Sequence, residues 1–93
     1  MKQLLKKLGK KGFYEILLFV EEKGQARYSE VLDYVVTNKI VASDATVTAA
    51  LNYFTELGLL KRRTSQERPV RTNYSLSKKG KLLAKYLFEL ERL

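Results

Sequence analysis

The sequence predicts a mainly α-helical domain with one small β-hairpin, an α+β fold class. Four segments carry apolar residues at the three- and four-residue spacing of a helix with one buried face. Between the third and fourth segments, residues 59–76 contain two strand-like runs around a polar loop that holds the only proline. A length of 93 residues suits one core, so we expect residues 1–93 to form a single domain.

The composition excludes several kinds of chemistry. The chain has no Cys and no His, so it offers no disulfide, thiolate nucleophile, imidazole base or ordinary zinc site. Its 10 carboxylates are scattered among 18 Lys and Arg residues, without an evident acid and base pair. We therefore expect no enzymatic activity and no cofactor, and no small-molecule ligand is evident.

A net charge of +8 indicates an anionic partner, with nucleic acid first and an anionic membrane surface second. No apolar run reaches the roughly 18 residues that span a bilayer. Residues 1–11 lack the small-residue cleavage site of a secretory signal. We expect a cytoplasmic, nucleoid-associated protein with double-stranded DNA as its partner and no membrane association.

The N-terminal half predicts two helices. Residues 1–12 form a lysine-rich segment, either a short amphipathic helix or a basic arm, and residues 13–23 form the first clear helix, which ends at Gly24. Residues 25–28 are too short for more than a brief extended segment. Ser29 is the predicted N-cap of the second helix. The apolar stripe of that helix comprises Val31, Leu32, Val35 and Val36.

A third helix is predicted from its N-cap Ser43 to Gly58, with Val47, Leu51, Phe54 and Leu57 on one stripe. Residues 59–63 then form a strand that becomes basic, and residues 70–76 alternate as a half-buried strand. Ser77 caps the last helix, over residues 77–93. This order of two helices, a turn-linked third and a basic ribbon describes a winged helix-turn-helix.

The third helix is expected to enter the major groove of DNA. The face opposite its apolar stripe carries small and hydrogen-bonding side chains that suit close approach to bases and phosphates. The predicted contacts on it are Ser43, Ala45, Thr46, Thr48, Ala49, Asn52 and Tyr53. An ordinary solvated helix surface is the alternative interpretation, and the helix has no Arg or Lys for the commonest guanine contact.

The hairpin carries the stronger indication of DNA binding. Arginine bonds two phosphate oxygens at once and fits a narrow minor groove. The predicted contacts are Lys61, Arg62, Arg63, Arg68 and Arg71. The alternative is a charged turn that protects an exposed edge strand, for which lysine would serve equally well.

The last helix has an apolar face broader than one small domain needs. The face either folds back onto the first helix or pairs with the same helix of a second copy, and we favour a homodimer. Its predicted dimerisation residues are Leu82, Leu83, Tyr86, Leu87, Leu90 and Leu93.

Three stretches resemble winged-helix regulators of the MarR, HxlR and PadR type, especially small archaeal ones. Residues 43–62 are similar to their N-capped reading helix followed by "G-L-L-x-R" and a basic wing. Residues 74–80, Tyr-Ser-Leu-Ser-Lys-Lys-Gly, match their entry into a final helix, and residues 28–31 look like the opening of their second helix. The resemblance covers residues 13–93 and implies a homodimeric, sequence-specific transcriptional regulator that binds duplex DNA.

Three other functions remain open from the residues. One is a non-specific architectural, viral or plasmid DNA-binding protein. Another is a protein-interaction module, because winged helices also serve in multisubunit complexes. Binding to a membrane surface is the most remote, because the basic residues cluster on a hairpin and not along one amphipathic helix.

Overall fold

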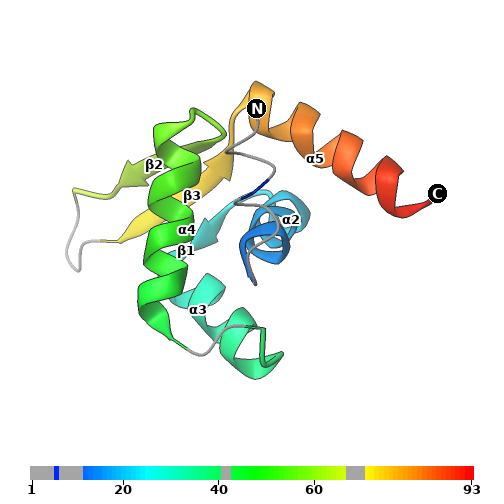
Figure 1. Ribbon diagram of the computed structural model, residues 1–93. Coiled ribbons are helices and arrows are strands. Elements are labelled where there is room, and N and C mark those ends of the chain that lie inside the picture. The colour runs from blue at the N-terminus through cyan, green and yellow to red at the C-terminus, as the bar shows by residue number, and fades with distance from the viewer. Residues whose placement is uncertain (1–5, 7–11, 41–42, 67–70) are drawn as a thin grey trace.

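The computed structural model describes residue 6 and residues 12–40, 43–66 and 71–93. Its elements are α2 (Phe13–Lys23), β1 (Ala26–Arg27), α3 (Tyr28–Thr37), α4 (Asp44–Glu56), β2 (Leu60–Thr64), β3 (Thr72–Leu76) and α5 (Lys78–Glu91). Helices α2, α3 and α4 gather against the sheet, while the far end of α5 projects from the body (Figure 1). The predicted α+β class and the winged helix-turn-helix order are confirmed.

The sheet has three antiparallel strands in the order β1-β3-β2, one strand more than the predicted hairpin. Residues 26–27, expected only as a brief extended segment, pair with β3 so that Ala26 lies opposite Tyr74. A strand of two residues has no alternation for a sequence to display, which is why the pairing was missed. The pairing makes β3 the central strand and leaves β2 at an edge.

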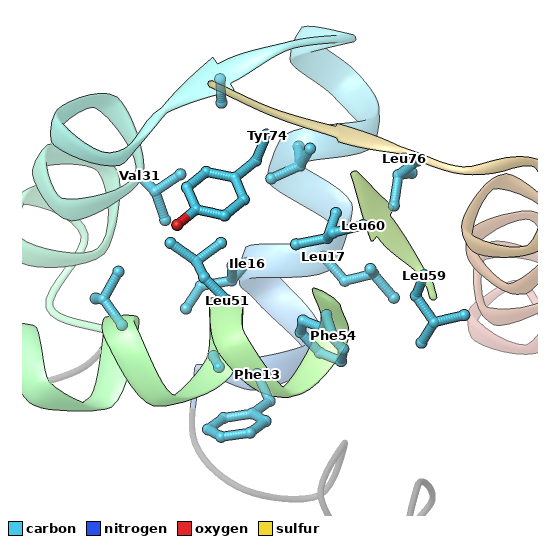
Figure 2. Packing of buried hydrophobic residues seen from close by; sticks show 14 of the residues in the cluster. Phe13, Ile16, Leu17, Val31, Leu51, Phe54, Leu59, Leu60, Tyr74 and Leu76 are labelled. Carbon is cyan, nitrogen blue, oxygen red and sulfur yellow. The ribbon is translucent and has the colours of Figure 1, made fainter. Parts of the chain in front are cut away.

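One apolar core joins the helices to the inner face of the sheet. Ile16 and Leu17 of α2 and Leu51 and Phe54 of α4 are fully buried, and Tyr74 of β3 is 5% exposed. Figure 2 shows these side chains converging from both sides of the core. Because α4 puts this face into the core, its opposite face is turned outward.

Helix α3 departs from the sequence prediction at its start and on one face. It begins at Tyr28 after the extended N-cap Arg27, so Ser29 lies inside the first turn and is not the cap. The carboxylate of Glu30 accepts a hydrogen bond of 2.9 Å from the backbone N–H of Arg27, which takes the place of a Ser29 cap. Val36, expected in the apolar stripe, is 57% exposed.

The junction of α4, β2 and α5 is tightly packed. Gly58 follows the C-cap of α4 with φ of 76°, a backbone conformation that favours glycine. Ser77 caps α5 by accepting the backbone N–H of Gly80 at 3.0 Å, and its own N–H donates to Leu59 O at 3.0 Å. The side chain of Ser77 also donates to the Gly58 carbonyl. These bonds tie the start of α5 to the end of α4.

Candidate nucleic-acid interface

The outward face of α4 carries most of the residues predicted to contact bases. Ala45, Thr48, Ala49 and Asn52 are exposed on it. On the opposite face, the buried residues Val47, Ala50, Leu51 and Phe54 anchor the helix in the core. Small exposed side chains let the backbone of such a helix approach a groove, and an Asn amide pairs well with adenine. We call Ala45, Thr48, Ala49 and Asn52 the reading face.

Three other predicted contacts on this helix have internal roles. Ser43 is the N-cap, as predicted: its hydroxyl accepts from the backbone N–H of Thr46 at 3.4 Å and lies 3.1 Å from the Thr46 hydroxyl. Tyr53 is half-buried, and its ring centroid lies 6.3 Å from that of Phe13. Tyr53 therefore forms part of the core edge, and only its exposed portion can contact DNA.

Tyr28 contacts the start of α4, which the sequence did not predict. Its hydroxyl lies 3.0 Å from the Thr48 hydroxyl and donates to the backbone carbonyl of Asp44 at 3.2 Å. The first turn of α3 thereby holds the first turns of α4, where the reading face begins. Tyr28 and Thr48 are 20 residues apart, so only the fold brings them together.

The same turn of α3 contains the one titratable group whose pKa clearly departs from its ordinary value in the described part of the chain. The backbone N–H of Arg27 and the ammonium of Lys23 lower the pKa of Glu30. The Lys23 Nζ lies 3.0 Å from a carboxylate oxygen of Glu30. This ion pair links the end of α2 to the start of α3.

The cations of the predicted wing do not form one cluster. Lys61, Arg62 and Arg63 are exposed on β2. Arg62 lies opposite Tyr74, a residue of the inner face, whereas Lys61 and Arg63 lie opposite Ser75 and Asn73. Side chains alternate between faces along a strand, so Arg62 belongs to the α4 side of the sheet and the other two to its outer side.

The remaining predicted cations lie nearer the tip of the hairpin. Arg71 is exposed, and its carbonyl accepts the N–H of Ser65 at 2.7 Å, which extends the pairing of the ribbon beyond β2 and β3. Arg68 lies outside the described residues.

The six predicted dimerisation residues of α5 divide between two faces. Leu83 and Leu87 are half-buried against the core of the same chain, beside buried Ala84. The other four are exposed: Leu82 by 51%, Tyr86 by 54%, Leu90 by 61% and Leu93 by 98%. Phe88, 55% exposed, was not predicted and adds to the apolar surface.

A membrane-spanning helix and a metal-binding cluster are both absent from the residues that the structure describes. Among them, no helix is long and apolar enough to cross a membrane. Within the same residues, no three or more acidic side chains gather as a metal site would require.

Comparison with known proteins identifies the family and the fold. Residues 7–93 match the HxlR-like helix-turn-helix family. The reduced form of the transcriptional regulator YodB from B. subtilis is similar in structure, with a TM-score of 0.79, 23% identity, and coverage of 99% of this chain and 85% of that chain. No curated protein matches the chain.

Two further solved structures share the fold. A PadR-like transcription factor from bacteroid fragilis has a TM-score of 0.78 and 20% sequence identity. The match covers 98% of this chain and 86% of that chain. A MarR-family regulator described as putative, from Porphyromonas gingivalis W83, has a TM-score of 0.75 at 19% identity, over 98% and 84%. The archaeal source expected from the sequence stays a prediction.

Proposed function

Because the chain belongs to the HxlR-like helix-turn-helix family of DNA-binding transcription regulators, we propose that it regulates transcription as a homodimer that recognises a specific duplex sequence. In this proposal residues 1–93 act as one domain, α4 lies in the major groove, and the wing contacts the backbone or the minor groove. The observation that carries it is the outward face of α4, where Ala45, Ala49 and Asn52 are exposed on a helix anchored from behind.

The reading face is matched to a base edge by size and by hydrogen bonding. Alanines at positions 45 and 49 let the helix approach closely and offer methyl groups to thymine, and Asn52 can bond adenine through two hydrogen bonds. The first turn of α4 also offers a phosphate those backbone N–H groups that the Ser43 hydroxyl does not bind. Tyr28 keeps that turn in place through its hydroxyl contacts.

The α4 side of the wing supplies the backbone contact. Arg62 lies on this side of β2, and Arg71 lies next to the tip. The planar guanidinium groups bond phosphate oxygens in pairs. Each phosphate so neutralised steepens the dependence of log affinity on log salt by about 0.9 for duplex DNA.

The apolar surface of α5 supports pairing with a second copy. Tyr86, Phe88 and Leu90 are each more than half exposed, and fully burying one such side chain contributes roughly 1.5–3 kcal/mol. Beside them, α2 and α5 form an open groove of about 590 Å³ whose lining includes Leu18 and Ala84. A two-fold partner would place its own α5 there, because an isologous interface pairs like with like.

Selection of bound sequences from random duplex DNA, together with the mass in solution, tests the proposal. We expect a roughly palindromic motif and a dimeric mass. Asn52→Ala should relax the preference at one position of each half-site, since one good bidentate contact contributes about 1–3 kcal/mol of discrimination. Glu56→Ala, an exposed change at the end of the same helix, is the matched control and should leave the motif unchanged.

Two alternatives have distinct outcomes in the same experiment. A non-specific architectural protein is favoured by the lack of Lys and Arg in α4, and it would retain DNA without any motif. A protein-interaction module would retain no duplex at about 0.15 M salt, where electrostatic attraction is screened beyond about 8 Å. A monomeric mass would contradict the dimer alone.

A further inference from the structure

The outer face of the sheet holds a second group of cations, apart from those on the α4 side. Lys61 and Arg63 of β2 point to this face, away from buried Tyr74. At the base of the wing they line an open cleft of about 280 Å³ together with Lys81 of α5. We call this the outer basic cleft. Its full lining is Gly24, Gln25, Lys61, Arg63, Asn73, Ser75, Leu76 and Lys81.

The cations of the outer basic cleft form no ion pair among the described residues, and Lys81 also lines the α2–α5 groove, which contains Glu21 and Glu22. None of the residues that line the outer basic cleft is acidic. In the described part of the chain, the ion pairs join Lys23 and Arg27 to Glu30, and none involves Lys61, Arg63 or Lys81. Three like charges that line one cleft repel one another, and an anion in the cleft would relieve that repulsion.

Protection of a sheet edge explains only part of this arrangement. Strand β2 is at the edge of the sheet, where basic side chains discourage pairing with another chain. That role accounts for Lys61 and Arg63. It does not account for Lys81, which comes from α5 and lines the same cleft. The convergence of cations from two elements therefore points to a ligand.

The character of the cleft favours a phosphate backbone over a small molecule. Small-molecule sites are enclosed and mostly apolar, whereas this cleft is open and its lining is largely polar. Gln25, Asn73 and Ser75 add amide and hydroxyl groups beside the cations. Lys, Arg, Asn, Gln and Ser side chains are those that contact the DNA backbone.

The cleft and the reading face lie on opposite sides of the core. The inner face of the sheet contributes Tyr74 to the core, and α4 contributes Leu51 and Phe54 from the other side (Figure 2). The reading face is turned away from that core, as is the outer face of the sheet. A duplex in contact with Asn52 is thus separated from Lys81 by the thickness of the domain.

We propose that the outer basic cleft binds the phosphate backbone of a second DNA segment, so that the regulator holds two stretches of DNA at once. The inference rests on the proposed function, because it takes DNA as the partner of the reading face. The sequence specificity would come from α4, since backbone contacts carry no sequence information.

Capture of a free fluorescent duplex by the full chain on an immobilised duplex tests the proposal. The variant K61Q/R63Q/K81Q should lower capture at least about tenfold, because three phosphate contacts are removed. Its affinity for a single duplex in solution should fall by clearly less than its capture does, because Arg62, Arg71 and the reading face are intact. The control K78Q/K79Q/K85Q removes the same charge from exposed positions of α5 and should capture as the unaltered chain does.

The outcomes separate this inference from the proposed function. If the unaltered chain binds one duplex but captures no second, the cleft inference fails and the proposed function stands. If it binds no duplex, the proposed function fails as well. Capture that survives K61Q/R63Q/K81Q, or equal loss of single-duplex binding and capture, would overturn the second-segment role. So would tight binding of pyrophosphate, measured by calorimetry, without capture of DNA.

Discussion

Replacement of Gly80 by alanine tests the contact that positions α5. A Cβ atom at this position would lie 2.1 Å from the carbonyl oxygen of Leu59 and 2.9 Å from Leu76 Cδ2. The neighbouring atom is backbone, so the start of α5 must move away from β2 by about 1 Å, and overpacking of this kind costs about 1–3 kcal/mol. The shift also weakens the hydrogen bonds of Ser77 to the Leu59 and Gly58 carbonyls, each worth about 1 kcal/mol.

The expected sign is opposite to that of intrinsic helix propensity. Alanine in place of glycine would stabilise an unobstructed helix interior by about 1 kcal/mol. We expect instead a net loss of about 1–3 kcal/mol in the free energy of unfolding, after that gain is subtracted from the packing and hydrogen-bond terms. For a domain of this size each kcal/mol lowers Tm by about 4–8 °C.

Thermal and urea denaturation followed by circular dichroism measure this loss. Lys78→Ala, an exposed change in the same turn, is the control and should stay within about 0.5 kcal/mol of the unaltered chain. A Gly80→Ala variant with an unchanged or higher Tm would refute the close approach of α5 to β2. The mass in solution, measured in parallel, separates a loss of dimer from a loss of the fold.

Three further changes probe the reading helix, the dimer and the α2–α3 ion pair. Tyr28→Phe removes the hydroxyl that contacts Asp44 and Thr48, so DNA affinity measured by fluorescence anisotropy should fall about three- to tenfold. The far-UV circular dichroism spectrum should not change. An unchanged DNA affinity would contradict the positioning role of Tyr28. Leu90→Glu should shift the sedimenting species to monomer without lowering helix content, and a persistent dimer would place the interface elsewhere. Glu30 has a lowered pKa in the folded chain, so its contribution to stability is present above its ordinary pKa of 4.5 and is lost as pH falls through the lower folded value. In acid titrations Glu30→Gln should flatten this part of the stability profile, and an unaltered profile would show that the carboxylate makes no such contribution.

The elements that the sequence predicts well are those with long apolar periodicity. The face formed by Val47, Leu51 and Phe54 predicts both the buried side of α4 and, by exclusion, the side that carries Asn52. Local capping chemistry likewise predicts the starts of α4 and α5 at Ser43 and Ser77. These features depend on neighbours within one or two turns, which a sequence displays directly.

The sequence does not predict features that depend on contacts between distant segments, and it does not distinguish the two sides of the apolar face of α5. The two residues of β1 acquire their strand conformation only by pairing with β3. The hydroxyl bridge from Tyr28 to Thr48 joins two helices, and neither residue alone signals it. In α5 the sequence shows one broad apolar face, while packing on α2 divides it into a half-buried side with Leu83 and an exposed side with Tyr86.

The basic wing shows most clearly which features the sequence determines and which only the tertiary structure determines. The sequence by itself determined that Lys61, Arg62 and Arg63 lie on an exposed strand of a ribbon, because charge and alternation are local properties. Only the register of β2 on β3 decided that Arg62 shares the α4 side with Tyr74 while its two neighbours face the other way. Lys81 joined them through the packing of α5, 18 residues further along the chain than Arg63. Side-chain direction is set by the partner strand and the core, and a single sequence does not contain that partner.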